Sequence, residues 1–248
     1  MASKRSERTD VVDVVFDMET HDPDDCLTFL FLASHPRFRL KAVTLVPGTA
    51  EQVGLVESLL KRLEHPDIPI GADFPALSQK QIDGAINPWH RRAYFPQGAY
   101  PRSSQARPAW EVLSESCDAT TVLITGGPLT NVAAAIEHTN GQFAARVWLA
   151  QGGFAGCNIV PADVVLPKFA GKTVMSTFNF GANLPAARVA LAHPGFGQRR
   201  LVSKNVCHHQ SNMFTADRLH ELQANVRRAA GISISSLQLG LPCLLMHS

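Results

Sequence analysis

Short apolar runs alternate with segments of helical periodicity in the first third of the chain. The run VVDVVF at residues 11–16 predicts a buried strand, and two more strands are expected at residues 40–46 and 68–71. Between them, the apolar run at residues 26–33 predicts a buried helix, and leucines and valines at helical spacing predict another over residues 50–63. This alternation predicts an α/β fold, with an open, doubly wound, mostly parallel sheet flanked by helices.

The alternation returns in the second half of the chain, after a long interruption. Residues 74–108 are rich in Pro, Gln, Arg and aromatic residues with little periodicity, which predicts a long loop of the kind that often carries function. Strands are expected after that loop at residues 121–124 and 147–149. Helices are expected at residues 110–116, 129–137, 185–192 and 215–228.

Length and composition place domain limits on this pattern. The chain has 248 residues, enough for one α/β domain, which we expect over residues 11–230. Residues 1–10 are polar and charged without the apolar centre of a secretory signal, so they predict a disordered tail. Residues 231–248 are apolar without a clear amphipathic period, and we expect a foreign ending there, as truncation or alternative splicing produces.

Charge and cysteine usage exclude several classes of partner. The net charge is +2 and no basic stretch is interleaved with aromatics, so we expect no nucleic-acid partner. No run approaches the roughly 18 apolar residues that a membrane span needs. The five cysteines form no CxxC pair, which indicates neither a zinc site nor a disulfide framework. A reducing, cytoplasmic location is the simplest expectation.

Residues 17–25, hereafter the acidic turn, bring five carboxylates together directly after the first strand. They are Asp17, Glu19, Asp22, Asp24 and Asp25. Ligands of open parallel sheets bind outside the carboxyl ends of the strands, and clustered carboxylates repel one another unless a cation lies among them. Oxygen ligands suit a hard ion such as Ca²⁺ or Mg²⁺. The alternative is a solvated acidic loop that caps the helix after it.

Taken with later segments, the acidic turn resembles the opening of the nucleoside hydrolase family. That family begins with a strand and a turn of the form Asp-x-Asp-x-x-x-Asp-Asp, which binds calcium and ribose. The present turn has one extra residue and carries a glutamate at the second position. Further matches follow in the family's order: AVTLVPG at residues 42–48, TGGPLTNVA at 125–133, QGGFAGCN at 151–158 and TFN at 177–179.

The resemblance implies a ribonucleoside N-glycosidase with one bound Ca²⁺. It implies that Glu19 and Asp25 ligate the metal, with Asp17 or Asp22 as substitutes for Glu19 because of the extra residue. It implies the main-chain carbonyl of Gly126 as a further ligand. Asp24 would be the base that activates water.

The substrate is expected to be a nucleoside, gripped at the ribose by Asn158 and Asn179. A leaving base needs a proton or strong hydrogen bonds, and His90 and Trp89 in the long loop are candidates for contacting it. The alternatives are a surface role for His90 and core packing for Trp89. Such folds are commonly even-numbered homo-oligomers, so a dimer or tetramer is a further expectation.

The chain also departs from the family pattern. Thr177 stands where the family has a glutamate, and no late His-Asp pair follows residue 200. His208-His209 lies in a polar stretch that favours a plain surface loop. A second hypothesis is therefore a catalytically impaired relative that binds a nucleoside, or a partner subunit, without turnover.

Overall fold

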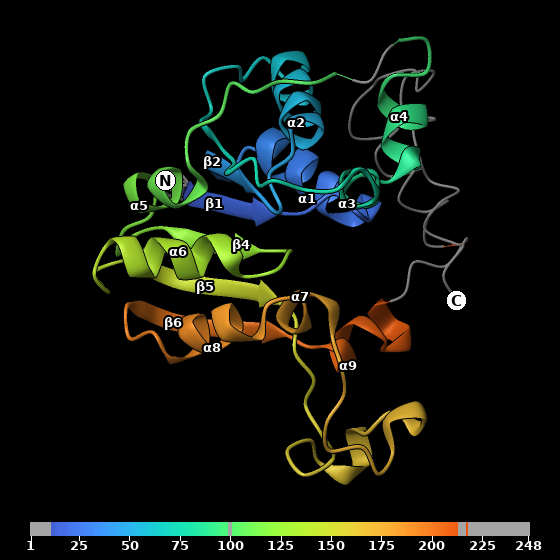
Figure 1. Ribbon diagram of the computed structural model, residues 1–248. Coiled ribbons are helices and arrows are strands. Elements are labelled where there is room, and N and C mark those ends of the chain that lie inside the picture. The colour runs from blue at the N-terminus through green and yellow to red at the C-terminus, as the bar shows by residue number, and fades with distance from the viewer. Residues whose placement is uncertain (1–10, 99–100, 213–216, 218–248) are drawn as a thin grey trace, which may run out of the picture.

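The computed structural model describes residues 11–98, 101–212 and 217, and its centre is a six-stranded sheet in the order β3-β2-β1-β4-β5-β6 (Figure 1). Every pair of neighbouring strands in this sheet is parallel. The predicted fold class is thereby confirmed, and the described sheet is wholly rather than mostly parallel. The strands are β1 Val12–Met18, β2 Phe38–Leu45, β3 Ile70–Gly71, β4 Val122–Thr125, β5 Ala145–Gln151 and β6 Phe196–Val202.

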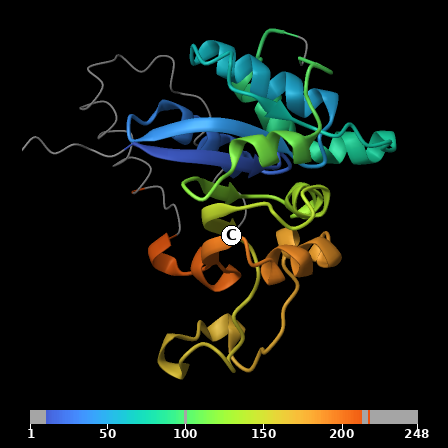
Figure 2. The same ribbon diagram turned by 90° about the vertical axis from the view of Figure 1, so that its left-hand side faces the viewer.

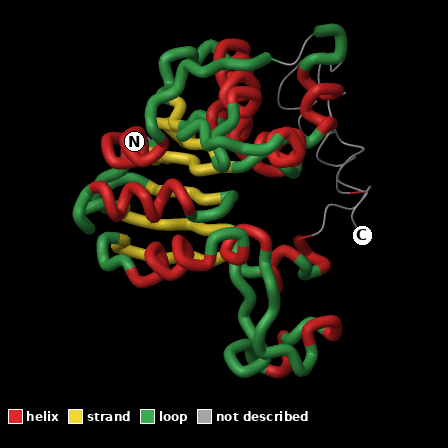
Figure 3. Tube along the Cα trace, viewed as in Figure 1, coloured by secondary structure: helices red, strands yellow, loops and turns green. Residues whose placement is uncertain are grey.

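Helices cover both faces of the sheet (Figures 2 and 3). On β1, Val14 and Phe16 belong to a core cluster with α1 and α2, whereas Val15 belongs to a cluster with α5, α6 and α8. Alternate residues of a strand point to opposite faces, so a continuous apolar run is what a strand buried on both sides requires. The helices are α1 Pro23–Ser34, α2 Ala50–Arg62, α3 Gln79–Ala85, α4 Pro88–Tyr94, α5 Ala109–Ser116, α6 Thr130–His138, α7 Phe178–Gly181, α8 Leu184–Ala192 and α9 Lys204–Cys207.

The predicted elements up to α2 lie within a few residues of the observed ones. The prediction of a long loop over residues 74–108 is wrong. That segment contains α3 and α4. The side chain of Asn87 accepts a hydrogen bond from the Trp89 amide and caps α4, and Trp89, Ala93 and Tyr94 are buried. Their apolar spacing is too short to show a helical period, so composition suggested a loop where tertiary packing makes helices.

Strand β6 was not predicted from the sequence. Only Phe196 of this strand is buried, and most of its other side chains are exposed. It lies at the edge of the sheet that the described residues form, where polar residues are tolerated and no apolar run appears. The tails at 1–10 and 231–248 and, except for residue 217, the helix expected at 215–228 lie outside the described residues. In the described part of the chain, no helix has the length and apolar character needed to cross a bilayer.

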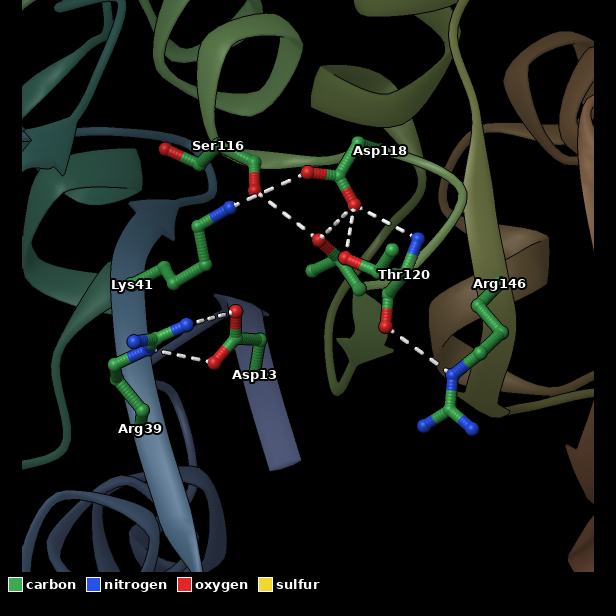
Figure 4. Close-up of polar contacts among 8 residues, drawn as sticks. Asp13, Arg39, Lys41, Ser116, Asp118, Thr120 and Arg146 are labelled. Atoms are coloured by element: carbon green, nitrogen blue, oxygen red, sulfur yellow. Dashed lines mark hydrogen bonds and ion pairs between the residues drawn. The ribbon is translucent and has the colours of Figure 1, made fainter. Parts of the chain in front are cut away.

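The amino ends of the strands are held by paired charges and polar contacts (Figure 4). At the start of β1 and β2, Arg39 donates two hydrogen bonds to Asp13, at 2.6 and 2.5 Å. The ammonium of Lys41, on β2, lies 3.7 Å from the carboxylate of Asp118, which precedes β4. Arg146 donates to the Thr120 carbonyl at 3.1 Å. Arg39 and Asp13, and Lys41 and Asp118, therefore form ion pairs that serve the fold at the amino ends of the strands.

Candidate active site

The acidic turn lies where the strand order reverses, at the carboxyl ends of β1 and β4. These two strands are neighbours, and Asp17 of β1 is paired with Thr125 of β4. The chain runs outward from β1 through β2 to β3 on one side, and from β4 to β6 on the other. Such a switch point opens a crevice outside the strand ends, which is where doubly wound proteins bind ligands. The position of the acidic turn at this switch point is thus a consequence of topology alone.

Asp17, near the end of β1, has a fully buried carboxylate, and one of its two oxygens has no hydrogen-bond partner. Its Oδ1 accepts hydrogen bonds from Thr44 Oγ1 at 2.6 Å and from Asn131 Nδ2 at 2.8 Å. Its Oδ2 is buried and has no hydrogen-bond partner. Burial raises the pKa of Asp17 from 3.8 to about 7. An unpartnered buried oxygen is costly, so this atom calls for a proton or a cation.

Glu19 and Asp25 are tied together at the centre of the acidic turn. The Glu19 amide donates to Asp25 Oδ2 at 3.0 Å, and the Glu19 carboxylate accepts from the amides of His21 and Asp22. Burial, opposed by these hydrogen bonds and reinforced by neighbouring carboxylates, raises the pKa of Glu19 to about 7. Burial and the charge of Asp24 raise the pKa of Asp25 well above its ordinary value.

Gly126, the first residue after β4, fits directly against Asp25 of this pair. A Cβ built on Gly126 would lie 2.2 Å from Asp25 Oδ1, so no other residue has room there. The Gly126 amide donates to the Asp17 carbonyl at 2.9 Å. The carbonyl that the resemblance implied as a metal ligand therefore belongs to a residue that contacts the Asp25 carboxylate and the main chain of Asp17.

Asn179, on α7, contacts the backbone of Gly126 although it lies 53 residues further along the chain. Its Nδ2 donates to the Gly126 carbonyl at 2.6 Å and lies 3.0 Å from the Gln151 carbonyl and 2.5 Å from Gln151 Oε1. The structure thus gathers Asp17, Glu19, Asp25, Gly126 and Asn179 into one connected set. Gln151 was not predicted, although it immediately precedes the glycine pair that the family resemblance used.

Asp24 and Asn158, the remaining polar candidates, are both exposed. Asp24 lies in the first turn of α1, where partial burial and the charge of Asp22 raise its pKa. Asn158 lies on the segment between β5 and α7, which extends away from the sheet as a lobe (Figure 1). Within the described residues, no side-chain hydrogen bond joins Asn158 to the acidic turn. The structure therefore does not bring Asn158 to the other predicted sugar ligand.

Trp89 and His90 lie behind the acidic turn rather than on an exposed loop. Both are buried in α4, and His90 Nε2 lies 3.1 Å from the carbonyl of Thr20. Burial lowers the pKa of His90 to about 4. The Trp89 ring packs edge-on against His90 and Tyr94 at 5.3 and 5.5 Å between centroids. The expected loop position is corrected, because these rings fill the core beneath the turn.

His21 and Phe178 form an exposed aromatic pair beside the gathered residues. Their rings are nearly parallel, 19° apart, with centroids separated by 5.8 Å. His21 Nδ1 lies 2.7 Å from the Gly84 carbonyl, and the Phe178 side chain is 60% exposed. Sequence reasoning missed both residues. The sequence offered one indication of them, which is that each lies next to predicted site residues: Phe178 precedes Asn179, and His21 lies within the acidic turn.

The donor chemistry at this site fits a hard divalent cation. All candidate donors are oxygens, Asp17 Oδ2 is unpartnered, and none of the ion pairs among the described residues includes a carboxylate of the acidic turn. Across residues 11–98 and 101–212, however, no three His, Cys, Asp or Glu side chains stand ready to hold a metal ion. The fit is one of donor type and charge.

Comparison with known proteins identifies one family. The family model described as inosine-uridine preferring nucleoside hydrolase matches residues 14–239. An uncharacterised protein of Aquifex aeolicus (strain VF5) is 28% identical over 178 residues, which is 71% of this chain and 57% of that protein. The chain therefore spans little more than half the length of this curated relative.

Solved structures agree on the fold. The inosine-uridine preferring nucleoside hydrolase from Bacillus anthracis superposes with a TM-score of 0.58 at 17% identity, covering 89% of this chain and 73% of its own. An inosine-guanosine nucleoside hydrolase superposes with a TM-score of 0.57 at 20% identity, covering 88% and 68%. Identities this low show the shared architecture alone.

Proposed function

This chain belongs to the inosine-uridine preferring nucleoside hydrolase family, and we propose that it hydrolyses the N-glycosidic bond of ribonucleosides to ribose and free base. One observation carries the proposal. Asp25 from the acidic turn and Asn179 from α7 meet at the backbone of Gly126, so predicted metal-binding and sugar-binding residues from three distant segments converge.

Carboxylates and a carbonyl would hold the cation in this proposal. Asp17, Glu19 and Asp25 supply negative oxygens and Gly126 supplies its main-chain oxygen, which suits Ca²⁺. A bound divalent ion would supply charge that makes water more acidic and fixes ribose hydroxyls. Burial of these carboxylates costs free energy in the ion's absence, so the fold itself favours a positive charge among them.

The reaction proceeds through an oxocarbenium-like ribose, with water adding at C1 as the bond to the base breaks. Asp24, exposed in the first turn of α1, would accept the proton of that water on its carboxylate. Asn179 would orient the ribose, with Asn158 as a second sugar ligand from the lobe. The departing base takes up a proton from solvent, and Asp24 afterwards returns the proton of the water to solvent.

For the base, we assign the contact to the exposed rings of His21 and Phe178 in place of Trp89 and His90. A planar base can stack on an aromatic face that solvent can reach. Trp89 and His90 are instead buried, and His90 supports the turn through Thr20. Direct contact of either side chain with a base would require the core beneath the turn to open.

The decisive experiment measures reducing sugar released from inosine and from uridine by the purified full chain with calcium. Asp24→Asn should abolish release, whereas Asp67→Asn, a matched exposed carboxylate before β3, should leave it unchanged. Absence of turnover by the unaltered chain, or full activity of Asp24→Asn, would contradict the proposal.

A second candidate is binding without turnover. It is favoured by Thr177, which stands where the family carries a glutamate, and by the position of Asn158 on the exposed lobe. Calorimetry separates the two functions, because this candidate gives heat of binding for inosine without release of ribose.

Two wider expectations stay proposals. A cytoplasmic setting agrees with the free thiols of Cys26, Cys117, Cys157 and Cys207 among the described residues. A homodimer or homotetramer is testable by sedimentation of the purified protein.

A further inference from the structure

A cavity lies outside the candidate active site, between the lobe and the segment after β6. It has a volume of about 460 Å³ and is lined by Leu166, Pro167, Lys168, His208, His209 and Gln210. Residues 167–169 form a short 3-10 turn in the lobe, and His208 directly follows α9. None of the residues that line the pocket belongs to the candidate active site.

Lys168 and His208 form a close pair across this pocket. The Lys168 Nζ lies 2.6 Å from His208 Nδ1. A lysine ammonium has only donors, so Nδ1 must be the acceptor, and the neutral ring then carries its hydrogen on Nε2. Each side chain keeps N–H groups to offer: two on the ammonium and one on the imidazole. The pair is thus a cluster of donors with a positive charge.

Phe169 holds both members of this pair in place. Its ring is 3% exposed and packs against Phe154 with centroids 5.2 Å apart. The Lys168 ammonium lies 5.5 Å from the centre of the Phe169 ring, and the His208 ring meets its edge at 5.7 Å. Because one buried ring positions both donors, little side-chain entropy is left to lose when a ligand binds.

The charges around the pocket are positive. None of its six lining residues is acidic. Partial burial, followed by the charges of Lys168 and Lys204, lowers the pKa of His208. No carboxylate among the pocket's lining residues balances the two lysines at this ring, which leaves a local excess of positive charge and unused donors.

We propose that this pocket binds a phosphate group through Lys168 and His208. A phosphate has several strong acceptor oxygens and a negative charge, which match the donors and the potential of the pocket. The volume also accommodates a small molecule that carries the phosphate, since ligand pockets of this size are common. The proposal does not depend on hydrolysis at the acidic turn.

A chain of contacts connects this pocket with Asn179. Gln151 lies 2.5 Å from Asn179 through Oε1, and its Nε2 donates to Cys207 Sγ at 3.3 Å. Cys207 directly precedes His208 of the pocket. The phosphate comes either from solution as a free anion or from a sugar phosphate, and these contacts mark the direction in which the ribose of a sugar phosphate would extend toward Asn179.

The test is calorimetric titration of the full chain with inorganic phosphate at low ionic strength. Lys168→Ala and His208→Ala should each weaken binding about tenfold or more, as expected for loss of a hydrogen bond to a charged group. Lys172→Ala is the matched control, because Lys172 is an exposed lysine of the same lobe outside the pocket, and its affinity should stay within about twofold. Unchanged melting temperatures would establish that the variants fold.

Ribose 5-phosphate and ribose distinguish the two sources. Binding of ribose 5-phosphate much more tightly than either phosphate or ribose supports a sugar phosphate spanning both sites. Equal binding of phosphate and ribose 5-phosphate supports a free anion. The proposal is overturned if phosphate gives no saturable heat at millimolar concentrations, or if Lys168→Ala and His208→Ala bind it as the unaltered chain does.

Discussion

The carboxylate of Asp25 lies against the backbone of Gly126, so close that a methyl group on Gly126 would be 2.2 Å from Asp25 Oδ1. This contact joins the turn after β1 to the turn after β4 at the point where the strand order reverses. Asn179 binds the carbonyl of the same glycine at 2.6 Å. Gly126 is therefore the residue that the acidic turn and α7 both contact.

Replacing this glycine tests that conclusion. Gly126→Ala should destabilise the fold by about 1–3 kcal/mol, the usual cost of overpacking, because the added methyl must displace Asp25. Gly84→Ala is the matched control, since a Cβ at this position of α3 would meet nothing within 4 Å. Urea unfolding measures both variants. Equal stability of the two would show that Asp25 is free to move away from Gly126.

The raised carboxyl pKa values predict a distinctive dependence of stability on pH. In the absence of a cation, Asp17 has its pKa raised by burial from 3.8 to about 7, so the folded state binds its proton more tightly than the unfolded chain. The free energy of unfolding should then fall as pH rises between these two values, by about 1.4 kcal/mol for each pH unit.

Asp17→Asn should flatten this part of the stability profile, because asparagine cannot ionise while its Oδ1 can still accept from Thr44 and Asn131. Thermal melts with a chelator at several pH values measure the slope, and a constant offset between the proteins does not matter. A slope that persists in Asp17→Asn would assign the effect to other carboxylates, such as Glu19.

Calcium should reverse that loss. An ion that binds only the folded protein stabilises it by about 2.7 kcal/mol at one hundred times its dissociation constant. The melting temperature at neutral pH should therefore rise with calcium for the unaltered chain and for Asp67→Asn, and much less for Asp25→Asn. If calcium leaves the melting temperature unchanged, the acidic turn serves only to cap α1.

The exposed ring pair predicts a loss of binding that is specific for the base. Phe178→Ala should weaken inosine binding about tenfold, since stacking on an aromatic side chain is worth about 1–3 kcal/mol per base, and should leave ribose binding nearly unchanged. His21→Ala should act in the same direction. Calorimetric titration with inosine and with ribose measures both affinities.

A second phenylalanine–histidine pair provides the matched control. Phe31 and His35 lie at the far end of α1 with ring centroids 5.1 Å apart, and Phe31 is 55% exposed. Phe31→Ala should leave the affinities for inosine and ribose as they are. Equal weakening of ribose and inosine by Phe178→Ala would point to disturbance of Asn179 instead of a stacking surface.

Much of the fold was predictable because its strands are buried on both faces. The run from Val14 to Phe16 has no polar interruption, and a continuous apolar run of this kind is typical of a strand that helices cover on both faces. Edge strand β6 and the short helix α4 escaped prediction for the opposite reason. Phe196 is the only buried residue of β6, and α4 owes its stability to the packing of Trp89 and Tyr94 more than to local propensity.

The sequence alone identified the carboxylates of the acidic turn, because their place directly after a buried strand is a local property. The resemblance to the nucleoside hydrolase family, carried by short ordered motifs, implied Gly126 and Asn179. Tertiary structure decided which of them meet, leaving Asn158 on the lobe, placing Trp89 and His90 in the core, and exposing His21 beside Phe178. Distances between segments remote in sequence depend on helix packing and loop paths, which no local pattern encodes.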